Sequence, residues 1–145
     1  MNTELYETDY YSWTALQARL LKENRISEMD IKNLIEEITD MGNRHVDAVE
    51  SLSIVLVTHL LKWQYQPDQR SSSWRGSIVN SRNRIKRILK KNPGIKGKIP
   101  EIYSDIYEDA LSVAIAETGL KREVFPTENP WTFDEIMELD FFPNN

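Results

Sequence analysis

The sequence contains no cysteine among its 145 residues. This absence excludes disulfide bonds, cysteine-ligated metal centres and thiol nucleophiles. Long hydrophobic runs are also missing, because the most apolar stretch, residues 52–61, contains Ser53, Thr58 and His59 and is too short to span a bilayer. No basic residue precedes Arg19 and no apolar signal-peptide core is present, so we expect a cytoplasmic protein without a membrane segment.

Several patterns that carry catalysis are absent as well. Di-metal carboxylate bundles use Glu-x-x-His motifs, but Gly42 and Leu56 stand three residues before the two histidines. Two histidines without cysteine are a poor basis for a zinc site, and the five glycines form no phosphate-binding loop. No Gly-x-Ser-x-Gly nucleophile motif occurs. We therefore expect neither a metal nor a cofactor, and the sequence leans away from an enzyme.

Acidic residues are missing from one long segment. Residues 69–100 hold ten basic side chains and no Asp or Glu, although the whole chain has 18 basic residues, 23 acidic residues and a net charge of -5. A segregated cluster of this kind attracts phosphates, because each neutralised phosphate also releases counterions. The alternative is that this segment lies beside acidic helices of the same bundle and balances their charge.

Helical periodicity is the main feature that the sequence does contain. Apolar residues recur at spacings of three and four in residues 6–24 and 31–41, each set on one helical face. Residues 43–65 are apolar nearly all round, which predicts the central and most buried helix. Gly42, between the last two segments, either ends a helix or kinks it, and the sequence leaves open whether the two segments form one continuous helix.

Capping signals give further boundaries. Ser27 with Asp30, and Thr132 with Glu135, resemble capping boxes that open helices. Ser72 or Ser73 is expected to cap a fourth helix that ends near the sequence KKNPG. A fifth helix is predicted from Pro100 to a C-cap at Gly119. The fold class is all-α: an up-and-down bundle of about four main helices with a short C-terminal helix, in a single domain over residues 1–145.

The basic segment supplies the first candidate site. We predict a binding surface within residues 70–98, for nucleic acid or an acidic protein, with these candidate residues: Arg70, Trp74, Arg75, Arg82, Arg84, Arg87, Lys90 and Lys91. Arg75 and Arg82 lie two turns apart, either as phosphate ligands or as internal partners for carboxylates of the bundle. The four tryptophans are expected mainly in core and corner packing rather than in base stacking.

His59 supplies the second candidate site. It shares a helical face with Leu56, Leu60 and Trp63, so a core histidine with one hydrogen-bonded nitrogen is the simpler interpretation. A functional role would need Glu36 or Glu37 to meet it from the preceding helix and to raise its pKa. A structural ion-pair network would give the same pattern.

Several stretches together resemble a known family. They are LYETDYYSWTALQARLL, MDIKNLIEEI, HLLKWQYQPDQRSSSW, the NPGI turn and FPTENPW. In this order they are similar to the bacterial domain-of-unknown-function family twenty-nine, over almost the whole chain. The resemblance implies an all-helical domain, and it carries over no catalytic residue.

Three functions stay open from the sequence. The first is a non-enzymatic binding or adaptor module that uses the basic segment, with binding that weakens steeply as salt rises. The second is a structural, homo-oligomerising bundle that buries an apolar patch. The third is a phosphodiester hydrolase built around His59, with Glu36 or Glu37 and Arg75 or Arg82, which requires these side chains to converge on an accessible pocket.

Overall fold

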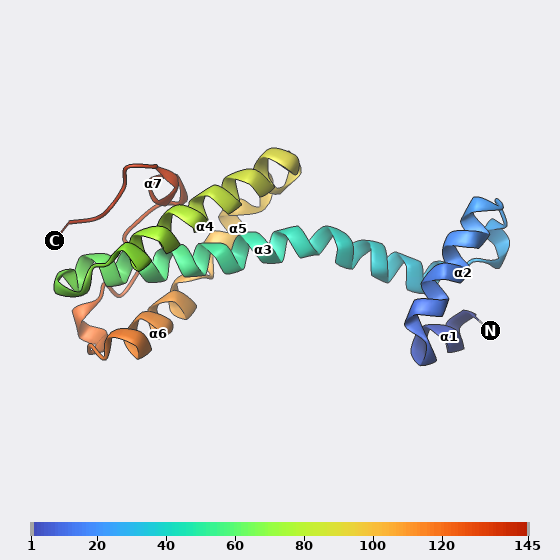
Figure 1. Cartoon of the computed structure of the whole chain (residues 1–145), viewed down its shortest axis with the longest axis horizontal. Helices are drawn as coiled ribbons and strands as arrows, with labels where there is room; N and C mark the ends of the chain where they lie inside the picture. The colour runs from blue at the N-terminus through green and yellow to red at the C-terminus, as the bar shows by residue number, and fades with distance from the viewer. Residues whose placement is uncertain (1, 145) are drawn as a thin grey trace. The chain divides into compact units, whose positions relative to one another are not determined.

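The computed structural model describes residues 2–144, and within them the chain forms helices joined by turns, without a strand (Figure 1). The all-α prediction is confirmed. The chain divides into two compact units, Met1–Arg44 and His45–Asn145, here called the N-terminal and the C-terminal unit. The expectation of a single domain stays a prediction. Within residues 2–144, no helix has both the length and the apolar character that a membrane crossing requires.

The N-terminal unit begins with two short helices, α1 (Asn2–Thr8) and α2 (Tyr10–Lys22). The periodicity of residues 6–24 suggested one helix, but α1 ends before Asp9 and α2 begins after it. The Asp9 carboxylate accepts hydrogen bonds from the Ser12 backbone N–H at 3.1 Å and from the Ser12 hydroxyl at 2.6 Å. A side chain that accepts from the first turn stabilises a new helix start. Asp9 therefore caps α2.

Helix α3 (Ile31–Tyr65) follows a 3-10 turn, η1 (Ile26–Glu28). The predicted capping role of Ser27 is wrong, because Ser27 lies inside that turn. Asp30 takes this position instead: its carboxylate accepts from the backbone N–H of Asn33 at 3.4 Å and the side-chain amide of Asn33 at 2.8 Å. It also accepts the indole N–H of Trp13 at 3.0 Å. One buried carboxylate thus fixes α2 to the start of α3.

Gly42 neither ends nor divides this segment. The two helices expected on either side of it are one helix of 35 residues, α3. The boundary between the two units falls within α3, after Arg44. Beyond that boundary the helix is buried on most sides, as predicted for residues 43–65: Val49, Leu56, Leu60 and Leu61 are all fully buried.

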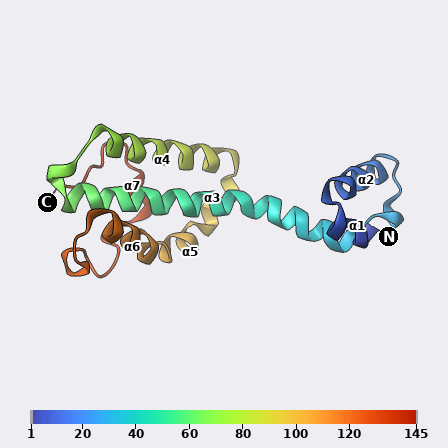
Figure 2. The same ribbon diagram turned by 60° about the horizontal axis from the view of Figure 1, so that its bottom comes forward.

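The C-terminal unit is built around that buried part of α3. After the 3-10 turn η2 (Pro67–Gln69), α4 (Ser72–Lys91) returns antiparallel along one side of it. The turn η3 (Pro93–Lys98), α5 (Ile99–Ser104) and α6 (Tyr107–Thr118) then bring the chain to another side of α3 (Figure 2). Ile78 and Ile85 of α4 and Leu111 of α6 meet the α3 residues in one apolar core.

Local signals set most of the remaining boundaries. Ser71 caps α4 by accepting the backbone N–H of Trp74 at 3.2 Å, so the predicted caps at Ser72 and Ser73 were one and two residues late. The fifth predicted helix is divided into α5 and α6, and its C-cap at Gly119, with φ +73°, is confirmed. After the turn η4 (Arg122–Val124), the capping box of Thr132 and Glu135 opens α7 (Phe133–Met137), as predicted.

Candidate functional site

Helix α4 and the η3 turn expose a set of cations. These residues, called the α4–η3 cations below, are Arg84, Lys86, Arg87, Lys90, Lys91, Lys96 and Lys98. Each is solvent-exposed, and within residues 2–144 none of them forms an ion pair with a carboxylate. Helical phase explains the exposure of the five cations on α4, because α4 turns Ile78, Ile85 and Leu89 into the core and leaves the opposite face to solvent.

The spacing on α4 places several of these cations next to one another. Arg84, Arg87 and Lys91 follow at intervals of three and four, so they are neighbours on the helix surface. No carboxylate interrupts the chain between Asp68 and Glu101. Like charges at this spacing repel each other, and a multiply charged anion would relieve that repulsion. The charge pattern of the sequence had indicated this region, although the candidate binding residues chosen from it did not include Lys86, Lys96 or Lys98.

Arg82 requires a correction, because it does not belong to an exposed binding surface. Its side chain is 1% exposed, and its guanidinium donates to three backbone carbonyls of α7 and the segment after it. Its Nε lies 2.6 Å from the Ile136 carbonyl oxygen and its Nη1 lies 3.2 Å from the Leu139 carbonyl oxygen. Its Nη2 donates to the Phe141 carbonyl oxygen. Burial lowers the pKa of Arg82, although Asp140 and Glu138 act in the opposite direction. Arg82 thus holds the C-terminal segment against α4.

Helical phase was the signal for this role. Arg82 stands four residues after Ile78 and three before Ile85, and both isoleucines are fully buried. Residues at these intervals share a face. The sequence prediction had paired Arg82 with carboxylates or phosphates, whereas its partners in the structure are carbonyl oxygens. Backbone acceptors carry no sequence signature, so only the inward orientation could have been foreseen.

Arg70, Trp74 and Arg75 lie at the corner where α3 turns into α4. The Arg75 guanidinium lies 5.1 Å from the Trp63 ring centroid and 4.4 Å from that of Phe142. Arg70 donates through Nε to the Trp63 carbonyl at 2.7 Å, and Lys62 lies 4.7 Å from the ring centroid of Trp74. These side chains have intramolecular partners, so we assign them to the packing of the corner rather than to ligand binding. We therefore keep them apart from the α4–η3 cations.

The side chains of the hydrolase hypothesis belong to two different units of the chain. His59 is half-buried, and its Nδ1 lies 2.8 Å from the Val55 carbonyl oxygen of its own helix. Glu36 and Glu37 belong to the N-terminal unit and stand on α3, not on a preceding helix as that hypothesis required. The Glu37 carboxylate accepts hydrogen bonds from Tyr6 at 3.0 Å and from Tyr10. Of the two arginines that the hypothesis named, Arg75 and Arg82, Arg82 is sealed in the core.

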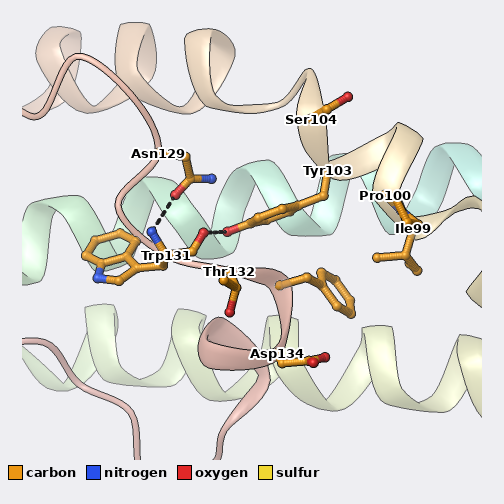
Figure 3. Close-up of a pocket in the computed structure, with 9 residues that line it drawn as sticks. Ile99, Pro100, Tyr103, Ser104, Asn129, Trp131, Thr132 and Asp134 are labelled. Atoms are coloured by element: carbon orange, nitrogen blue, oxygen red, sulfur yellow. Dashed lines mark hydrogen bonds between the residues drawn. The ribbon is translucent and has the colours of Figure 1, made fainter.

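A pocket of about 560 Å³ opens between α5 and the segment leading into α7 (Figure 3). Its polar groups are largely used by the protein itself. The Tyr103 hydroxyl donates to the Trp131 carbonyl at 2.9 Å, and the Asn129 side-chain oxygen accepts the Trp131 backbone N–H at 3.1 Å. Burial raises the pKa of Tyr103 to about 12, which keeps its hydroxyl a donor. The pocket was not predicted, and its polar contacts fix the turn that carries Trp131.

Comparison with known proteins identifies the family. The family model described as "Domain of unknown function DUF29" matches residues 5–142. The chain belongs to the DUF29 family. Neither the curated proteins nor the solved structures gave a significant match. Membership of DUF29 confirms the resemblance drawn from the sequence, and it assigns no role to any residue, so the functional argument depends on the site itself.

Proposed function

We propose that the protein is a non-enzymatic module that binds nucleic acid through the α4–η3 cations. The observation that supports this most directly is that seven exposed cations lie within residues 84–98 without an intramolecular carboxylate partner in the described chain. Phosphates of a nucleic acid would supply the missing negative charge, and the released counterions would drive binding. A cytoplasmic location, expected from the sequence, stays a prediction.

The composition of the exposed α4 face favours nucleic acid over an acidic protein. Besides its cations, that face carries Asn80 and Asn83, whose amides can bond to phosphate oxygens or base edges. Val79, at 40% exposure, is its only exposed large hydrophobic residue, and no exposed aromatic ring lies on it. Protein interfaces are enriched in aromatic residues and methionine at their centres. The α4 face lacks such a centre.

Binding of labelled mixed-sequence DNA and RNA at several salt concentrations tests the proposal. We expect affinity to fall steeply with salt, since each phosphate contact contributes about 0.9 to the slope of log K against log salt. In the triple variant Arg84→Glu/Arg87→Glu/Lys91→Glu, the slope should fall by about 3 and binding at moderate salt should be lost.

A second triple variant provides the matched control. Arg19→Glu/Lys32→Glu/Arg44→Glu changes net charge by the same amount but alters exposed residues of the N-terminal unit. Binding by this control at near wild-type affinity would locate the interaction on α4. Equal losses in both variants would indicate a general charge effect and contradict the assignment. Absence of binding at low salt would remove nucleic acid and leave an acidic protein as the next partner to test.

A further inference from the structure

The N-terminal unit leaves most of its large apolar side chains in solvent. Trp13 and Leu20 are its buried hydrophobic residues, and the other buried hydrophobic residues of the described chain all lie in the C-terminal unit. Exposure of 49% to 64% is found for Tyr10, Leu21, Ile31, Ile35, Ile38 and Met41. The stripe seen in the sequence at residues 31–41 is therefore a helical face that the N-terminal unit itself leaves largely uncovered.

A groove runs between α2 and α3 within this unit. It encloses about 290 Å³ and is lined by apolar side chains that recur at helical intervals on both helices, among them Trp13 and Leu21 on α2 and Leu34, Ile38 and Met41 on α3. Among the described residues, Glu37 is the only charged one in its lining, and its carboxylate already accepts hydrogen bonds from two tyrosines. The groove is thus apolar and nearly uncharged.

One polar group in the groove lacks a partner. Gln17 lines it and is 3% exposed. Its side-chain oxygen accepts the Asp30 backbone N–H at 2.8 Å, but its Nε2 is buried and has no acceptor within residues 2–144. A buried donor without an acceptor costs about 1–3 kcal/mol in general. A partner that seats an acceptor here would remove that cost and also fix its register, as single polar core residues do in helical bundles.

We propose that this groove binds a second copy of the chain, so that two α2–α3 pairs form a four-helix bundle about a twofold axis. Both helices carry apolar residues at intervals of three and four, which is the pattern that buries a seam between packed helices. A twofold interface pairs one surface with itself, and the charge of Glu37 in this groove is already met by hydrogen bonds from Tyr6 and Tyr10, so the two copies would repel each other little.

The size of the N-terminal unit supports a second copy as the occupant. A unit of this length has too small a core to be stable alone, and oligomerisation is a usual remedy. Four of the six exposed apolar side chains, Tyr10, Leu21, Ile38 and Met41, line the groove, so a second copy would cover them. A charged partner helix would find no matching charge in the groove, whereas a second copy presents the same apolar surface.

Light scattering coupled to size-exclusion chromatography tests the proposal on the full chain. We expect the wild type to show twice the 17.0 kDa mass of one chain. Ile38→Glu should yield a folded monomer and weaken self-association at least a hundredfold, because Ile38 is 64% exposed within one chain and would be buried only in the dimer. Val113→Glu places the same change on α6, at a valine with 40% exposure, and should remain dimeric.

Cross-linking gives a second readout that does not require a charged substitution. The chain has no cysteine, so Ile38→Cys creates a unique thiol. A short bismaleimide should link two copies covalently in the Ile38→Cys variant and should leave a Val113→Cys control largely without a cross-link. A monomeric wild type at high concentration, a dimer that survives Ile38→Glu, or no cross-link at position 38 in a dimeric sample would each overturn the proposal.

Discussion

At the residue scale, Arg82 and Arg87 show how one helix uses the same side chain in two ways. Arg82 is buried and donates to three carbonyls, whereas Arg87 is exposed and forms no ion pair within the described residues. Arg82→Met should lower the free energy of unfolding by about 3–5 kcal/mol, because a buried charge network and its carbonyl acceptors would be broken. Urea unfolding followed by circular dichroism measures the loss.

The matched substitution Arg87→Met separates stability from binding. It should change the free energy of unfolding by less than ~0.5 kcal/mol, as surface substitutions usually do. It should nevertheless weaken nucleic-acid binding and reduce the salt slope by about 1. If Arg82→Met and Arg87→Met unfolded at the same urea concentration, the three carbonyl contacts would not have the structural role assigned to them.

Asp30 provides a residue-scale prediction of pH dependence. Burial alone would raise the pKa of this carboxyl, but hydrogen bonds from Asn33 and Trp13 outweigh it and leave the pKa below the ordinary value. A lowered pKa in the folded state stabilises the protein above the unfolded pKa of about 4, and this stability is lost as pH falls through the folded value. Acid should therefore loosen the contact between α2 and α3.

The indole N–H of Trp13 offers a direct measurement of this titration. In a proton–nitrogen NMR spectrum, its resonance should move in one step with a midpoint below about 4, because Trp13 donates to Asp30. In Asp30→Asn the resonance should no longer titrate. A midpoint above the ordinary aspartate value would show that burial, and not hydrogen bonding, controls this group.

At the scale of single elements, two glycines should respond to alanine with opposite signs. Gly119 ends α6 at φ +73°, where an L side chain is strained, so Gly119→Ala should cost about 1 kcal/mol. Gly76 lies inside α4, and a Cβ there would meet nothing within 4 Å, so Gly76→Ala should stabilise by about 0.5–1 kcal/mol. Thermal unfolding of both variants checks the sign, and a shared direction would contradict the assignment.

Element boundaries were predictable from the sequence where the capping signal is local. Thr132, paired with Glu135, directly precedes α7 and the left-handed Gly119 directly follows α6, and both predictions are confirmed. The start of α3 was misplaced, because Asp30 is chosen over Ser27 through its contact with Trp13, seventeen residues earlier. Gly42 gave no warning that α3 continues, since a helix tolerates an isolated glycine at a modest cost.

In the candidate site too, features set by local sequence were predictable and features set by distant contacts were not. Charge segregation along the chain is visible in the sequence, so the segment that contains the α4–η3 cations could be predicted. The separate fate of Arg82 depends on carbonyls more than fifty residues away, which no local pattern encodes. The apolar stripe at residues 31–41 was visible, but periodicity alone does not distinguish a face that packs internally from one left for a partner.

At the scale of the whole molecule, the two units should differ in local stability. The N-terminal unit has few buried apolar residues, whereas the C-terminal unit holds a large core around α3. Hydrogen exchange measured by mass spectrometry should show faster opening for α2 than for residues 49–61. Raising the protein concentration should protect α2 selectively if the groove binds a second copy. Equal protection throughout would instead support the single domain expected from the sequence.

The contacts of Arg82 also bear on how the chain is made. The three carbonyls that satisfy its guanidinium belong to Ile136, Leu139 and Phe141, which a ribosome adds more than fifty residues after Arg82 itself. Until those residues leave the exit tunnel, a nascent C-terminal unit can close its core only by burying an unsatisfied charge, which is costly. We therefore expect the core of this unit to close only after residues 136–141 have left the tunnel.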